Sequence, residues 1–135
     1  MHKAFVIALY TAALPVFAQS SLNVDWEWKS SHQCSSSSPA IVVSEIPNET
    51  KLLQITMVDH DARHYDHGGG NVQHNGDASV TVPEGALKNY KGPCPPNFSS
   101  FGHDYEFTVK AIAADGQTEL ARGRKTKTFS ASTVK

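Results

Sequence analysis

Apolar and polar residues alternate in two stretches of the chain. In residues 22–28 every second side chain is apolar, namely Leu22, Val24, Trp26 and Trp28. In residues 104–114 the same spacing gives a second apolar set, namely Tyr105, Phe107, Val109 and Ala111. Because successive side chains of a strand point to opposite faces of a sheet, both stretches are predicted to be half-buried β-strands.

Shorter segments predict further strands. Residues 51–58 contain no glycine or proline and give the clearest strand signal in the chain. Weaker strand signals lie at residues 41–43, 78–82, 118–122 and 125–129. Residues 86–90 are predicted to form one helical turn, and Asp115-Gly116 is typical of a hairpin. Because there is no repeat and no long amphipathic helix, the predicted fold class is mainly β, with a β-sandwich as the favoured architecture.

Three segments lack a periodic pattern. Residues 30–38 are rich in serine, and residues 92–102 contain three prolines, which stiffen a loop by fixing φ. Residues 59–77 carry four histidines and a run of three glycines, and they are predicted to be irregular. Long irregular segments in compact domains are usually functional. We therefore expect the chemistry of this chain to lie in residues 59–77 and near the proline-rich loop.

The N-terminus has the pattern of an export signal. Lys3 precedes an apolar run at residues 4–14, and Val16-Phe-Ala18 places small residues where a signal peptidase cleaves. The run is shorter than the roughly 20 residues that a membrane span needs. A membrane anchor or a buried N-terminal helix is the alternative interpretation. We expect a signal peptide at residues 1–18, a single domain at residues 19–135, and a periplasmic or secreted location.

Composition limits the partners of the domain. Removal of 18 residues from 135 leaves 117, a length typical of one domain with a single core. The loss of Lys3 reduces the 12 Lys and Arg residues to 11, against 13 Asp and Glu. Without a basic surplus, nucleic acid and anionic membrane are not expected partners. No second apolar stretch approaches the length of a membrane span.

Two cysteines, Cys34 and Cys94, are predicted to form a disulfide if the chain is exported. Such a bond closes a loop of about 60 residues, which stabilises the fold by roughly 4 kcal/mol in the chain-entropy model. Two free buried thiols are the alternative. The Cys-x-x-Cys spacing is absent, so a thiol–disulfide catalyst is not indicated.

Further motifs follow the strongest strand, and the last of them opens the second alternating stretch. They are Asp59-His-Asp61-Ala62, Asp66-His67-Gly68, Tyr90-Lys-Gly92-Pro93-Cys94-Pro95-Pro96 and His103-Asp-Tyr105-Glu-Phe107. In this order the motifs resemble those of the phosphatidylethanolamine-binding protein family, and more closely its bacterial Raf-kinase-inhibitor-like branch. The resemblance covers residues 34–114. It implies a β-sandwich with one or two short helices and a small anion pocket at one end.

The resemblance also implies the walls of that pocket. They are Asp59, Asp61, His67, Pro93, His103 and Tyr105. Imidazole and phenol groups donate hydrogen bonds to phosphate or carboxylate oxygens. We expect Asp61 to orient a pocket histidine, His67 and His103 to donate directly, Tyr105 to act as donor or wall, and Pro93 to shape the rim. The family's Asp-Pro-Asp-x-Pro reads Asp-His-Asp-Ala-Arg here, and Gly68 replaces a tryptophan, so a wider pocket is expected.

The favoured function is therefore a non-catalytic binding domain for a small anionic or phosphorylated ligand, without a cofactor. Two alternatives stay open, namely a metal-binding protein that uses the His/Asp-rich residues 59–74, and a hydrolase that uses the same pocket. Each residue also has a structural interpretation. Asp59 and Asp61 can cap turns, His103 can be a hydrogen-bonded core histidine, and Tyr105 can simply pack in the core.

Overall fold

The structure is a computed structural model that describes residues 3–13 and 20–135. The expected cleavage position after Ala18 lies outside the described residues. Residues 3–13 contain no helix or strand. In the described part of the chain, no helix is long and apolar enough to cross a membrane.

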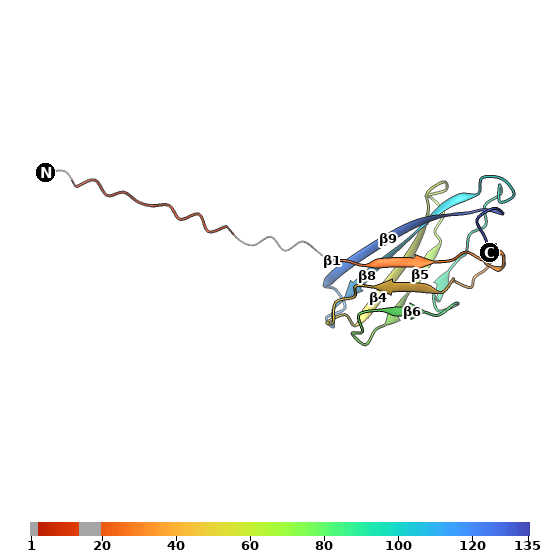
Figure 1. The fold of residues 1–135 in the computed structure, drawn as a ribbon, viewed down its shortest axis with the longest axis horizontal. Coiled ribbons are helices and arrows are strands. Elements are labelled where there is room, and N and C mark those ends of the chain that lie inside the picture. Colours follow the sequence, from red (N-terminus) through yellow and green to blue (C-terminus); the bar gives the residue numbers. More distant parts are fainter. Residues whose placement is uncertain (1–2, 14–19) are drawn as a thin grey trace.

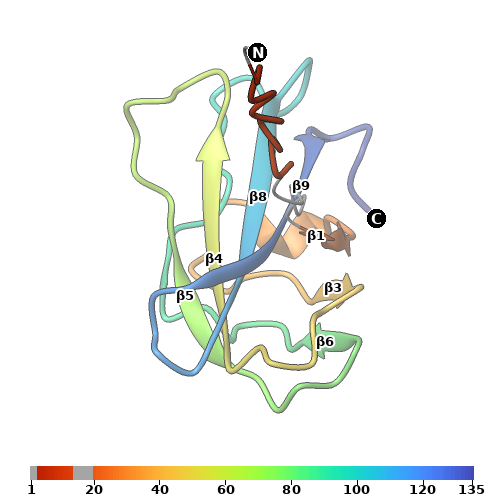
Figure 2. The same cartoon turned by 90° about the vertical axis from the view of Figure 1, so that its left-hand side faces the viewer.

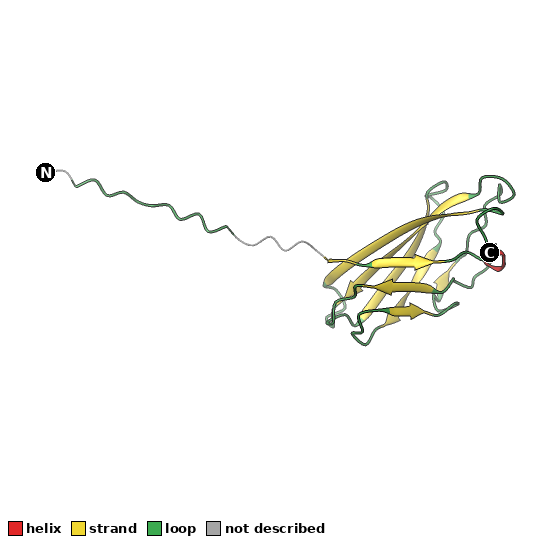
Figure 3. Ribbon diagram, in the orientation of Figure 1, coloured by secondary structure: helices red, strands yellow, loops and turns green. Residues whose placement is uncertain are grey.

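The described residues form a mainly β structure with two sheets (Figures 1 and 3). The larger sheet has the order β1-β9-β8-β4-β5-β7, and the smaller has the order β2-β3-β6. The larger sheet comprises β1 (Ser20–Ser21), β4 (Leu52–Asp59), β5 (Gly68–Gln73), β7 (Asn89–Tyr90), β8 (His103–Ile112) and β9 (Glu119–Phe129). The smaller sheet comprises β2 (Asn23–Trp26), β3 (Ile41–Ser44) and β6 (Val80–Val82). The helical structure in the described ranges is a short 3₁₀ helix, η1 (Ser30–His32).

Both alternating stretches form strands with one buried face, as predicted. The apolar set of residues 22–28 is buried, while Asn23, Asp25 and Glu27 are exposed. In β8 the apolar set that starts at Tyr105 is buried in the same way. Their two inner faces meet where the Trp26 and Phe107 rings pack edge to face, with centroids 4.9 Å apart. The sequence pattern thus identified the two surfaces that form the centre of the core.

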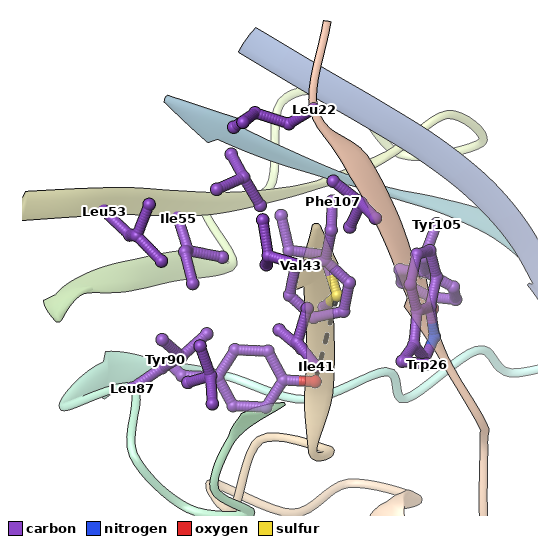
Figure 4. Close-up of a cluster of buried hydrophobic side chains, with 14 of the residues drawn as sticks. Leu22, Trp26, Ile41, Val43, Leu53, Ile55, Leu87, Tyr90, Tyr105 and Phe107 are labelled. Carbon is purple, nitrogen blue, oxygen red and sulfur yellow. Dashed lines mark hydrogen bonds between the residues drawn. The ribbon is translucent and has the colours of Figure 1, made fainter. Parts of the chain in front are cut away.

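One hydrophobic core joins the two sheets (Figure 4). Ile41 and Val43 of the smaller sheet belong to the same buried cluster as Leu53, Ile55 and Phe107 of the larger sheet. Each such side chain stabilises the fold by about 1.5–3 kcal/mol when it leaves water. This core holds β4 and β8 rigidly in the middle of the larger sheet, where they run side by side (Figure 2).

The pairing of β4 with β8 places two predicted site residues together. Their antiparallel register runs from Leu52 opposite Ile112 to Asp59 opposite Tyr105. β4 ends at Asp59, and His103 is the first residue of β8. The polar side chains therefore lie at one end of the two central strands, just beyond the apolar core.

The prediction that residues 59–77 are irregular is wrong for β5. This strand pairs with β4 on one side and β7 on the other. Glycine is depleted in strands, so the glycine run indicated a loop. Here it permits close approach of the neighbouring backbones, because an added Cβ would lie 1.8 Å from Asn89 O at Gly68 and 1.8 Å from Ile55 O at Gly69.

Two smaller predictions also need correction. Residues 86–90 form no helical turn, since they run through a turn into β7. The two strands predicted at residues 118–122 and 125–129 are one continuous strand, β9. Gly123 interrupted the sequence pattern, yet it lies within the strand, where an added Cβ would approach Leu22 O to 2.4 Å. The strands predicted at residues 41–43, 51–58 and 78–82 are confirmed as β3, β4 and β6.

The predicted disulfide between Cys34 and Cys94 is confirmed. Backbone hydrogen bonds reinforce it on both sides. The Cys34 N–H donates to Pro93 O at 2.8 Å, and the Gly92 N–H donates to Ser35 O at 2.8 Å. The serine-rich loop is thereby fixed against the proline-rich loop, and this pairing fits an oxidising compartment.

Candidate functional site

Asp59 is the buried centre of the candidate site. Its side chain is only 4 % exposed, and both carboxylate oxygens have partners. Oδ1 accepts a hydrogen bond from the Asp61 N–H at 2.9 Å. Oδ2 accepts one from His103 Nδ1 at 2.7 Å. The carboxylate is therefore held in one orientation by the turn that follows β4 and by the start of β8.

The partners of Asp59 keep it ionised. Burial opposes the charged form, but the hydrogen bonds from His103 and from the Asp61 N–H outweigh it, so the pKa of Asp59 lies below its ordinary value. The charged carboxylate can accept a hydrogen bond from the imidazole whether the ring is neutral or cationic. Asp59 therefore supplies a fixed negative charge that His103 can neutralise.

His103 has a defined tautomer in this arrangement. A carboxylate can only accept, so Nδ1 carries the proton that is donated to Asp59. This leaves Nε2 as the second nitrogen, which can donate when the ring is protonated. The side chain is partly exposed and lines a cavity, so Nε2 belongs to a group that a ligand can reach.

His67 is fixed by a reciprocal pair of hydrogen bonds with Lys91. His67 Nδ1 donates to Lys91 O at 2.8 Å, and the Lys91 N–H donates to His67 O at 2.9 Å. The remaining nitrogen, Nε2, lies 3.9 Å from Asp59 Oδ2. Both pocket histidines thus use Nδ1 for orientation and flank the same carboxylate oxygen.

Tyr105 forms the floor between the two histidines. Its ring centroid lies 5.4 Å from that of His67, at 90°, and 6.3 Å from that of His103. Burial raises the pKa of the Tyr105 phenol, and the neighbouring Asp59 carboxylate raises it further. The hydroxyl therefore stays protonated, and its hydrogen-bond partner is the Asp59 carboxylate.

These side chains open into a cavity of about 340 Å³. This volume is at the lower end of the range for small-molecule sites. The lining combines polar groups from β4, β8 and the loops that the sequence analysis marked as irregular. The lining residues are Asp59, Ala62, His64, Tyr65, His67, Gly92, Cys94, Pro96, His103 and Tyr105.

The structure brings four of the six predicted site residues together at this cavity, and two lie elsewhere. Asp61 is exposed, and its Oδ2 accepts a hydrogen bond from the Asp104 N–H at 2.8 Å. The role of histidine partner, expected for Asp61, lies with Asp59. Pro93 is buried outside the lining, and its carbonyl accepts the Cys34 N–H.

Several lining residues were not identified from the sequence. Tyr65 was not distinguished from its neighbours, and His64 was considered only within the His/Asp-rich residues 59–74 of the metal alternative. Gly92, Cys94 and Pro96 belong to the proline-rich loop, where the sequence analysis selected Pro93 instead. The sequence therefore indicated which segments border the cavity. It did not indicate which side chains point into it, because that depends on the turns within those segments.

For the metal-binding alternative, the structure points to other residues than the histidines of residues 59–74. Asp59, Asp61 and His103 offer ligand atoms that all lie within 4.8 Å of one another. The histidines outside the cavity do not join this group. His74 Nε2 donates to Asp77 O at 2.7 Å, and His60 Nδ1 accepts from Arg63 at 2.6 Å. Two carboxylates and one imidazole match the donor preferences of zinc.

The two β-sheets thus place a small cavity, lined by histidines, tyrosines and Asp59, beyond the central strands of the larger sheet. The profile of the phosphatidylethanolamine-binding protein family matches residues 16–134. The chain therefore belongs to the phosphatidylethanolamine-binding protein family. Among curated proteins, none matches this chain.

Proposed function

We propose that this chain is an exported, non-catalytic member of its family that binds a small phosphate- or carboxylate-type anion at the cavity around Asp59. One observation carries the proposal, namely that His67 and His103 both orient through Nδ1 and flank a buried carboxylate. The Cys34–Cys94 disulfide supports the export of residues 19–135 to the periplasm or the extracellular space. The β-sandwich description and the bacterial Raf-kinase-inhibitor-like branch belong to the same proposal.

The net charge of the site depends on whether His67 and His103 are protonated. Asp59 carries one negative charge, which alone would repel an anion. When both histidines are protonated, two positive charges face that one, and each imidazole donates from both nitrogens. The Tyr105 hydroxyl interacts with the Asp59 carboxylate, so the two imidazoles are the main donors to the anion. Two cationic imidazoles therefore outweigh the single carboxylate charge and attract an anion.

The lining supports binding rather than catalysis. It contains no serine or threonine hydroxyl among the described residues, and Cys94 is held in the disulfide. The Tyr105 phenol stays protonated, so it is a poor nucleophile. A hydrolase would need a nucleophile or an activated water close to the histidines.

Titration calorimetry with inorganic phosphate near pH 6 tests the proposal. The His67→Ala and His103→Ala variants should each bind at least about tenfold more weakly, because each loses a charge-assisted hydrogen bond. His60→Ala is the matched control, since His60 lies in the same segment but outside the cavity lining. Equal phosphate affinity in the wild type and both cavity variants would show that the anion site is wrong.

The group of Asp59, Asp61 and His103 favours a divalent cation as a second candidate ligand. Asp61 separates the two candidates, because it belongs to this group and not to the cavity lining. Zinc titration of the wild type and of Asp61→Asn therefore complements the phosphate experiment. A metal site would weaken in Asp61→Asn, while phosphate binding would be retained.

A further inference from the structure

A second hollow adjoins the candidate site. It measures about 250 Å³ and is lined by the two cysteines, Ser35, Ser36, Tyr65, Lys91 and Gly92. Tyr65, Gly92 and Cys94 line both cavities, so the two spaces share a wall. A ligand whose anionic group lies at the histidines can therefore extend over this wall into the second hollow.

The second hollow has a fixed shape. Its two sides are the serine-rich and proline-rich loops, which are joined by the disulfide and by the Gly92 N–H bond to Ser35 O. The loops approach so closely that a Cβ on Gly92 would lie 2.2 Å from Ser35 O. A preformed hollow avoids the entropic cost of ordering a loop around the ligand.

Lys91 supplies the charge of the second hollow. The lining contains no aspartate or glutamate, and the Lys91 ammonium is its one formal charge among the described residues. The Lys91 Nζ atom lies 5.8 Å from the centroid of the Tyr65 ring, within cation–π range. The Tyr65 ring in turn lies 4.6 Å from the His67 ring. Imidazole, phenol and ammonium thus form one continuous strip from the candidate site to the second hollow.

The backbone fixes Lys91 relative to the candidate site. Lys91 holds the His67 ring through its carbonyl oxygen, and its own side chain carries the ammonium. We propose that the ligand is a small bis-anion, with one anionic group at His67 and His103 and a second at Lys91. A ligand with an ammonium in the second position would meet the charge of Lys91 and bind more weakly. This inference rests on the anion site proposed above and specifies which anions that site prefers.

Three phosphate monoesters with different second groups test the inference by calorimetry. Phosphoglycolate carries a carboxylate, ethyl phosphate carries no charged group there, and phosphoethanolamine carries an ammonium. The wild type should bind phosphoglycolate about two- to fivefold more tightly than ethyl phosphate, the range for one exposed ion pair. Phosphoethanolamine should bind most weakly, and all differences should shrink in high salt.

Charge reversal at Lys91 should invert this order. In Lys91→Glu, phosphoethanolamine should become the tightest of the three ligands, and in Lys91→Met the differences should disappear. Lys88→Glu is the matched control, because Lys88 is exposed nearby in the chain but lines neither cavity, so the wild-type order should persist. Circular dichroism of each variant verifies that the fold is retained.

The outcomes separate this inference from the function on which it rests. If ethyl phosphate binds but the order of the three ligands is flat or unchanged in Lys91→Glu, the bis-anion inference is overturned and the anion site stands. If none of the three ligands binds the wild type, the anion site itself is wrong, and the inference fails with it.

Discussion

At the scale of single residues, Asp59 connects the apolar core to the chemistry of the cavity. It is the last residue of β4, it lies opposite Tyr105 in the sheet, and it accepts the hydrogen bond that fixes the His103 tautomer. On one side its carboxylate is buried and accepts hydrogen bonds on both oxygens, and on the other side the His103 ring lines the cavity. Stability and the proposed anion binding should therefore both depend on the Asp59 side chain.

Replacement of Asp59 by asparagine should change the acid dependence of stability. The folded state lowers the pKa of Asp59, so folding favours the ionised carboxyl relative to the unfolded chain, whose aspartates titrate near about 3.9. This contribution is fully present above the unfolded value and is lost as the pH falls below about 4. Urea unfolding should show a steeper loss of stability in the wild type than in Asp59→Asn over about pH 5 to 3.

At neutral pH, Asp59→Asn should lower the free energy of unfolding by about 1–3 kcal/mol, because the His103 hydrogen bond loses its charged acceptor. Asp61→Asn serves as the control. It removes the same formal charge from an exposed residue that lies two positions away in the chain. Identical pH profiles for the wild type and Asp59→Asn would contradict the assigned role of this carboxylate.

At the scale of elements, the sequence predicted strands where burial alternates and failed where glycine replaces side chains. β2, β4 and β8 followed from the pattern because their inner faces pack on one core. β5 has no side chains at Gly68, Gly69 and Gly70 to show which face is buried, so its pairing between β4 and β7 was not predictable. The chain turns immediately after Asp59, so Asp61 leaves the cavity although it lies only two residues away.

Gly68→Ala should destabilise the protein strongly if β5 is an interior strand of the larger sheet. Its φ is +65°, and an added Cβ would lie 1.8 Å from Asn89 O, so β7 would have to move. We expect a loss of about 3 kcal/mol or more in urea unfolding. Gly116→Ala is the control, since Gly116 has a φ of +74° and no atom within 4 Å of the added Cβ. It should lose only about 1–2 kcal/mol from backbone strain, and equal losses in the two variants would contradict the placement of β5.

At the scale of the whole molecule, the disulfide connects parts of the chain that no sheet joins. It links the loop after η1 to the loop after β7, and both loops border the second hollow. Lys91, which precedes Gly92, holds the His67 ring through its carbonyl oxygen. The restraint on the loop at Gly92 therefore reaches the candidate site through one peptide unit. The sequence indicated the cysteine pair, but it could not show that the joined loops enclose a second hollow.

Removal of the disulfide by Cys34→Ser together with Cys94→Ser should therefore lower both the free energy of unfolding and the phosphate affinity, for two different reasons. Opening a loop of 60 residues should lower the free energy of unfolding by about 4 kcal/mol. Among molecules that remain folded, phosphate affinity should fall by about two- to tenfold, because the loop around Gly92 and Lys91 must then be ordered by the ligand. Calorimetry at a temperature where circular dichroism shows the variant fully folded measures the second effect alone. If stability falls but affinity does not, the backbone hydrogen bonds between Cys34 and Pro93 and between Gly92 and Ser35 are sufficient to hold the cavity, and the disulfide acts only on the unfolded chain.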